Sequence, residues 1–166
     1  IDMDFMNLNQ SAHGDREHGY ITARMGIKRT VIAGHWENEE FRQQIGVWMR
    51  AAVGVFESRK TRVLRISDNM RSVAVTDGDK VEAQMKFGWE IEHYGVGDII
   101  AELEKVTDDE VDALMAEYAE KYTFATDNTE AVRYQAKEEI AIEKFMKARG
   151  FTAFHTNFED LQGLKQ

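Results

Sequence analysis

The chain has 166 residues, and its 30 acidic side chains outnumber its 21 lysines and arginines, which gives a net charge of −9 at neutral pH. Hydrophobic residues make up 43% of the chain and charged residues 31%, a composition typical of folded globular proteins. A surface this acidic repels phosphate backbones and anionic lipids, and no apolar run approaches the roughly 20 residues that span a bilayer. We therefore expect no nucleic-acid partner and no membrane partner. Cysteine is absent, which excludes disulfides and cysteine nucleophiles and favours a cytoplasmic location.

The ends of the chain are unusual. It begins with Ile1, and it ends at Gln166 directly after a predicted helix start. It contains no proline, where average usage of about 5% predicts roughly eight. These features predict a segment of a longer chain, with a processed small protein as the alternative interpretation.

In the first part of the chain, hydrophobic periodicity predicts alternating strands and helices. Residues 1–8 show mixed alternation and predict a strand, and the run TVIAG at residues 30–34 is typical of a buried parallel strand. One helix is predicted over residues 12–25. A second, longer helix is expected to begin after Asn38, because large apolar side chains then repeat on one stripe as far as Phe56.

The same alternation continues after a charged stretch at residues 58–62. Thr107 and Glu110 form a capping-box pattern that opens a helix, and Gly150 is the expected stop of another. Asp98 and Asn157 are expected to cap further helices. The expected strands are residues 62–67, 73–75, 89–94 and 151–156, and the expected helices are residues 80–87, 99–106, a segment after Thr107, 129–148 and 158–161.

Strands that alternate with helices of this length predict an α/β fold, with a mainly parallel sheet covered by helices on both faces. Such an arrangement is Rossmann-like or flavodoxin-like. We expect the domain boundary in the charged stretch at residues 58–62. On this interpretation, residues 1–60 are the C-terminal part of a first α/β domain and residues 62–166 are most of a middle α/β domain.

General catalytic motifs are sparse. The chain has no Walker loop, no G-x-S-x-G and no H-E-x-x-H. The pair Gly95 and Gly97 predicts a helix-entry turn rather than a dinucleotide site, because a third glycine is missing. His35 and His155 follow predicted strands, but lone histidines are more often structural, and neither is assigned a role. Spacing alone predicts no metal site.

Two polar loops follow predicted strands, at the position where open α/β folds bind ligands. They are residues 9–13 (NQSAH) and residues 68–71 (DNMR), and Phe158 follows the last strand in the same way. Amide and imidazole groups beside Met and Phe would suit a neutral polyol, since the polar groups reach hydroxyls and the apolar groups cover C–H faces. From spacing alone, capping and packing remain the better interpretation of these loops.

At these same residues the sequence resembles a known family. The resemblance extends in order over essentially the whole chain, and it indicates an internal segment that comprises the end of a first α/β domain and most of a middle domain. The family is L-arabinose isomerase, and the strings that carry the resemblance are IDMDFMNLNQSAHGDREHGYI, AGHWENEE, IGVWMRAAVGVFESRKTRVLRISDNM, VAVTDGDKVEAQMKFGWE and TAFHTNFEDLQGLKQ.

The resemblance implies aldose–ketose isomerisation of L-arabinose to L-ribulose, with D-galactose to D-tagatose as a side activity. It also implies a divalent metal, usually Mn²⁺, that polarises the carbonyl while carboxylates move protons through an enediol. A homohexamer with active sites shared between neighbouring subunits is implied as well. In the family pattern the metal ligands, two glutamates and two histidines, lie beyond Gln166, so we assign no catalytic or metal-binding residue here.

Four substrate-pocket residues carry over from the resemblance. Gln10 and His13, in NQSAH, match family residues that reach into a neighbouring subunit's pocket. Met70, in SDNMR, and Phe158, in TNFEDL, match residues that line the sugar site of their own subunit. We therefore expect the segment to supply pocket walls and subunit contacts, and to be inactive alone. The alternative is a non-catalytic α/β module that binds a sugar or only assembles.

Overall fold

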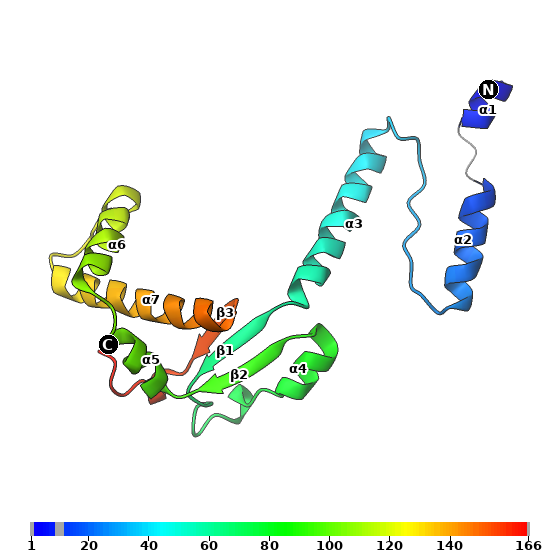
Figure 1. Ribbon diagram of the computed structural model, residues 1–166. Helices are drawn as coiled ribbons and strands as arrows, with labels where there is room; N and C mark the ends of the chain where they lie inside the picture. Colours follow the sequence, from blue (N-terminus) through cyan, green and yellow to red (C-terminus); the bar gives the residue numbers. More distant parts are fainter. Residues whose placement is uncertain (1, 9–11, 166) are drawn as a thin grey trace. The chain divides into compact units, whose positions relative to one another are not determined.

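A computed structural model describes residues 2–8 and 12–165 of the chain (Figure 1). Its contacts divide the chain into two compact units, Ile1–Ala51 and Ala52–Gln166. The division falls within the longest helix of the first half, α3 (Glu39–Ser58).

The regular structure described in the first unit is helical. It contains α1 (Met3–Leu8), α2 (Ala12–Arg24) and the beginning of α3. Before α3, the side-chain oxygen of Asn38 accepts a hydrogen bond from the backbone amide of Phe41 at 3.1 Å, as expected of a helix cap. The helices predicted after residue 12 and after Asn38 are therefore confirmed.

Both strands predicted in the first unit are wrong. Residues 3–8 form a helix, and residues 30–34 have no regular structure. A strand is stable only when its backbone pairs with a neighbouring strand and its side chains pack on a core. Within residues 2–8 and 12–51 the structure describes no strand that could serve as that neighbour. The β-rich composition of these two runs is therefore not enough to form a strand.

The second unit is built on a sheet of three parallel strands in the order β2-β1-β3. β1 (Arg62–Ile66) lies in the centre, between β2 (Glu90–Tyr94) and β3 (Ala153–Thr156). These three strands confirm the predictions for residues 62–67, 89–94 and 151–156. The strand predicted at residues 73–75 is wrong, because the chain forms a short 3-10 turn, η1 (Ala74–Thr76), there.

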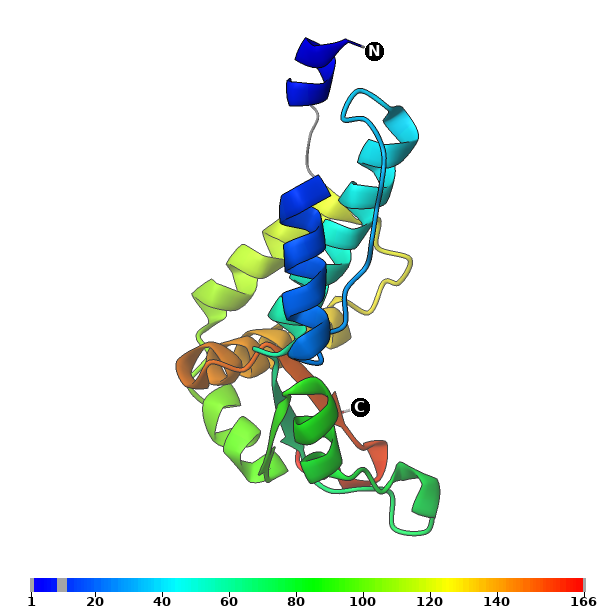
Figure 2. The same ribbon diagram turned by 90° about the vertical axis from the view of Figure 1, so that its right-hand side faces the viewer.

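Helices lie on both faces of this sheet (Figures 1 and 2). Leu64 and Ile66 of β1 pack against α5 (Val96–Leu103) and α7 (Thr129–Arg149), and both side chains are at most 2% exposed. Val63 and Arg65 of the same strand alternate to the opposite face, where α4 (Lys80–Phe87) lies. The predicted α/β fold with a parallel sheet is confirmed.

Helix α6 (Asp108–Lys121) packs on α7 and closes a second apolar cluster. Its capping box is present as predicted, with the hydroxyl of Thr107 and the carboxylate of Glu110 each accepting from the other residue's backbone amide. Gly150 ends α7 in the left-handed conformation, also as predicted. The cap expected at Asp98 is wrong: α5 begins at Val96, and Asp98 sits inside its first turn.

Candidate functional site

The chain leaves β1 and β3 toward opposite faces of the sheet. After β1 it leads to α4 on one face, whereas after β3 it passes to the other face, where the amide of Lys165 donates to the hydroxyl of Tyr134 in α7 at 3.2 Å. Neighbouring strands whose connections diverge in this way leave a crevice at their carboxyl ends, and α/β folds bind ligands there. The topology therefore predicts a ligand site at the carboxyl ends of β1 and β3, which we call the β1–β3 edge of the sheet.

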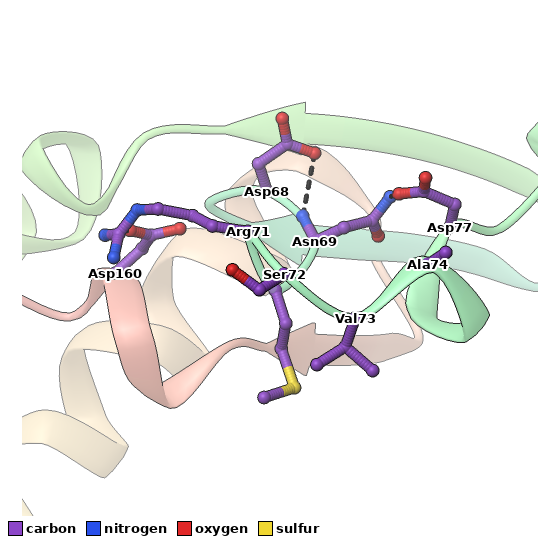
Figure 3. Close-up of a pocket in the computed structure, with 9 residues that line it drawn as sticks. Asp68, Asn69, Arg71, Ser72, Val73, Ala74, Asp77 and Asp160 are labelled. Atoms are coloured by element: carbon purple, nitrogen blue, oxygen red, sulfur yellow. Dashed lines mark hydrogen bonds and ion pairs between the residues drawn. The ribbon is translucent and has the colours of Figure 1, made fainter.

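A hollow of about 750 Å³ lies at this edge (Figure 3). Its lining mixes carboxylate, amide and hydroxyl groups with a few apolar side chains. The lining residues are Asp68, Asn69, Met70, Arg71, Ser72, Val73, Ala74, Asp77 and Asp160.

The loop after β1 is held by its own polar contacts. Ser67 has a φ of 69°, the left-handed region that few non-glycine residues adopt, and its amide donates to Tyr94 O at 2.7 Å. The carboxylate of Asp68 accepts a hydrogen bond from the backbone amide of Asn69 at 2.8 Å and another from the Arg65 guanidinium at 3.1 Å. The Asn69 amide, together with the positive charge of Arg65, holds the pKa of Asp68 below its usual range.

Polar contacts join this loop to η2 (Phe158–Asp160), the 3-10 turn that follows β3. The amide of Arg71 donates to Glu159 Oε2 at 2.9 Å, and its guanidinium donates to Glu159 O at 3.2 Å and to the Asp160 carboxylate. The hydroxyl of Ser67 donates to Asp160 O at 3.3 Å. Figure 3 shows the Arg71 and Asp160 side chains meeting at one end of the hollow. We call the contacts of Arg71 with Glu159 and Asp160 the loop clamp.

Two of the predicted site residues lie on the joined segments. Met70 lines the hollow and is half-buried, and Phe158 opens η2 with 69% of its surface exposed. His13 belongs to α2 in the first unit, where its side chain is exposed and Nδ1 lies 3.4 Å from Nη2 of Arg16. Gln10 lies outside the described residues. The structure thus brings the segments of Met70 and Phe158 to one sheet edge.

His35 and His155, the two histidines without an assigned role, do not line this hollow. His35 Nδ1 accepts from the Glu37 amide at 3.3 Å, as in a tight turn. His155 lines a smaller hollow of about 270 Å³ on the α4 face, beside Trp89 and Lys80.

The partners of Arg71 are what sequence reasoning missed. The sequence predicts the polar loop at residues 68–71 and the cap at Asn157. The hydrogen bond that Asn157 accepts from the Glu159 amide at 3.0 Å confirms the cap. No local signal in the sequence points to Asp160 as a site residue. It lies 89 positions from Arg71, and no local pattern connects residues so far apart.

The hollow offers hydrogen-bond donors and acceptors beside an apolar side chain, which suits a ligand with many hydroxyls. Across residues 2–8 and 12–165, no three His, Asp or Glu side chains are grouped as a metal ion would require. Within the same residues, no helix combines the length and the apolar character needed to cross a membrane.

Comparison with protein families matches the chain in two consecutive stretches. Residues 1–60 match the L-arabinose isomerase N-terminal domain, and residues 62–166 match the L-arabinose isomerase central domain. Together these matches extend over nearly the whole chain.

Curated relatives point to the same family. The chain is 53% identical to an L-arabinose isomerase of Clostridium beijerinckii over 167 residues, which are 100% of this chain and 34% of that protein. It is 52% identical to L-arabinose isomerases of Bacillus subtilis and Geobacillus thermodenitrificans, again over 100% of this chain and 35% of each relative. The chain spans about a third of the length of these curated relatives. Because the central-domain match alone accounts for more than half of its residues, the chain belongs to the L-arabinose isomerase family.

Proposed function

We propose that this chain supplies part of the sugar-binding wall of an L-arabinose isomerase, which interconverts L-arabinose and L-ribulose and accepts D-galactose, giving D-tagatose, as a second substrate. The observation that carries the proposal is the identity of 51–53% with named L-arabinose isomerases over the entire chain. The polar hollow at the β1–β3 edge supports it, because sugars need dense hydrogen bonding next to apolar C–H contacts.

We also propose a domain division. We assign residues 1–60 to the C-terminal part of the first α/β domain and residues 62–166 to most of the middle one. The limits of the two family matches support this division. The boundary then lies at the end of α3 and the start of β1.

The four predicted site residues have two roles in this proposal. Met70 and Phe158 cover the C–H faces of the sugar from the chain's own subunit. Gln10 and His13 reach into the pocket of a neighbouring subunit of the same homohexamer. The hexamer works in the cytoplasm. An amide and an imidazole suit hydroxyl recognition, since both can donate or accept.

The proposed enzyme uses a divalent metal, Mn²⁺, which polarises the substrate carbonyl when bound. The side chains described in residues 2–8 and 13–165 do not fit a metal site, because no suitable group of three ligands occurs among them. From the resemblance to the family, we propose that the metal ligands and the proton-transferring carboxylates lie outside residues 1–166. The residues of this chain bind and orient the sugar.

A chimeric enzyme tests the proposal. The stretch of the B. subtilis isomerase that aligns with this chain is replaced by the chain itself, and conversion of L-arabinose to L-ribulose is assayed. We expect an active chimera in which Met70→Ala, Phe158→Ala and Gln10→Ala each lower kcat/KM by roughly tenfold, the usual effect of losing one good pocket contact. Met85→Ala is the control, because Met85 lies on α4 with 82% of its surface exposed.

Two results would contradict the proposal. A chimera that does not fold, or folds without activity, would mean that the chain does not occupy this place in the enzyme. Unchanged kinetics for both Gln10→Ala and Met70→Ala would overturn the site assignment. The alternative function, a non-catalytic sugar-binding module, predicts an inactive chimera together with saturable, metal-independent binding of L-arabinose or L-arabitol in calorimetric titration.

A further inference from the structure

Met70 and Phe158 both lie on short segments held at each end by polar contacts. Met70 stands between Ser67, whose hydroxyl donates to Asp160 O, and Arg71, which bonds Glu159 and Asp160. The Met70 side chain takes no part in these contacts. The contacts with η2 therefore add to those of Asp68 with Asn69 and Arg65 in fixing the path of this loop.

The segment of Phe158 is ordered by the same group of residues. Asn157 is 4% exposed, its Oδ1 accepts from the Glu159 amide at 3.0 Å, and its Nδ2 donates to Asp160 Oδ2 at 3.2 Å. The Asp160 carboxylate thus has one oxygen turned toward Asn157 and the other toward Arg71. A buried amide on one side and a guanidinium on the other fix the orientation of this carboxylate.

Arg71 is held through both its backbone and its side chain. Its amide donates to the Glu159 carboxylate at 2.9 Å, while its guanidinium reaches Glu159 O and the Asp160 carboxylate. Because the Arg71 side chain is 63% exposed and that of Asp160 is 20% exposed, this ion pair contributes little to global stability. Its consequence is local: it joins two loops that leave different strands.

We infer that Arg71, Glu159 and Asp160 are positioning residues for the sugar pocket, because the loop clamp holds the segments of Met70 and Phe158 at a fixed separation. The inference rests on the proposed function, which places both side chains against the sugar. Small displacements of binding groups are costly in enzymes, so loss of the clamp weakens sugar binding by displacing Met70 and Phe158.

The test uses the chimeric isomerase described above. Arg71→Met removes the charge and keeps the length, Asp160→Asn removes the carboxylate charge, and the double variant combines both changes. Arg71→Lys keeps the charge but loses the planar fork. Lys105→Met is the matched control. Lys105, just after the end of α5, pairs with Glu102 at 2.8 Å, and the two side chains are 66% and 21% exposed, almost as in the clamp.

We expect Arg71→Met and Asp160→Asn each to raise KM for L-arabinose by roughly fivefold to tenfold, with kcat within about twofold of the parent. The double variant should be no worse than either single variant, because the two residues act as one unit. Arg71→Lys should recover part of the loss. Hydrogen exchange of the amides in residues 68–73 should accelerate in both single variants, while the melting temperature stays within about 2 °C of the parent.

Several outcomes separate this inference from the proposed function. If Met70→Ala impairs turnover while Arg71→Met changes neither KM nor loop exchange, the clamp is overturned and the sugar pocket stands. If Lys105→Met raises KM as much as Arg71→Met, the effect is not specific to the clamp and the inference is wrong. If Met70→Ala and Phe158→Ala leave the kinetics unchanged, the proposed function fails, whatever the exchange experiment shows for Arg71.

Discussion

The two units of the chain differ in what their apolar side chains contact. All ten buried apolar residues among those described lie in the second unit, where Leu64 is 0% and Phe145 is 1% exposed. In the described part of the first unit the buried residue is Thr22, whose hydroxyl donates to His18 O at 2.7 Å within α2. The large residues Trp48 and Met49 of α3 are 50% and 58% exposed.

This difference explains why similar apolar runs behave differently. Residues 30–34 (TVIAG) and β1 (Arg62–Ile66) are both short and rich in β-formers, yet β1 forms a strand and residues 30–34 do not. β1 has a neighbour on each side and helices over both faces. A short strand therefore depends on its partners, whereas the helices of the first unit form from local hydrogen bonds and caps.

The largest expected effect tests the burial contrast directly. Leu64→Ala removes a fully buried side chain from the central strand, and we expect it to lower the free energy of unfolding by about 2–5 kcal/mol. Trp48→Ala, in the half-exposed stripe of α3, should cost less than about 1 kcal/mol despite the larger side chain. Urea unfolding followed by circular dichroism measures both. Equal losses would mean that α3 has a core of its own.

Two glycines should respond with opposite signs. Gly150 ends α7 with a φ of 72°, and a Cβ there would lie 3.1 Å from Arg62 Nη1, so Gly150→Ala should destabilise the protein by about 1–2 kcal/mol. Gly19 lies within α2, where a Cβ would make an ordinary 3.7 Å contact with Arg29, so Gly19→Ala should stabilise that helix by up to about 1 kcal/mol. Thermal unfolding of the two variants gives the signs, and a destabilising Gly19→Ala would contradict the helix assigned to this segment.

The sequence predicts the second unit better than the first for a physical reason. The helices around β1, β2 and β3 have strong local signals, such as the capping box at Thr107 and the stop at Gly150, and the parallel sheet follows from their alternation with strands. The first unit lacks strand partners within residues 2–8 and 12–51, and no local signal reports that.

The same limit applies to the candidate site. Position after a strand is a local property, so the loop of Met70 and the segment of Phe158 could be predicted from the sequence. The pairing of Arg71 with Asp160 depends on how β1 and β3 lie side by side, and it becomes visible only in the folded sheet.

Helix caps offer a smaller test of the same contrast. Thr107 caps α6, whose Val111 is 3% exposed in the core, so Thr107→Ala should lower the free energy of unfolding by about 1 kcal/mol. Asn38 makes the equivalent contact at the start of α3, but Asn38→Ala should cost less than about 0.5 kcal/mol, because fraying of that end exposes no buried side chain. Denaturant midpoints measure the first effect and the helical circular dichroism signal measures the second. A midpoint shift for Asn38→Ala as large as that for Thr107→Ala would show that the two helices are coupled to equally large cores.

The smallest expected effect concerns two glutamates, one in each unit. Burial raises the pKa of Glu138 in α7, so at pH values between the ordinary glutamate pKa of about 4.3 and the raised value the folded state binds more protons than the unfolded state. Stability therefore falls as the pH rises through this window, and Glu138→Gln should remove that fall.

Hydrogen bonds from Arg42, and from Gln43 next, lower the pKa of Glu39 in α3, so the contribution of Glu39 to stability is lost as the pH falls. Because Glu39 is exposed and solvent screens its contacts, Glu39→Gln should leave the pH profile of the urea midpoint almost unchanged. A clear change in that profile would show that the first unit, like the second, couples its charged groups to a cooperative fold.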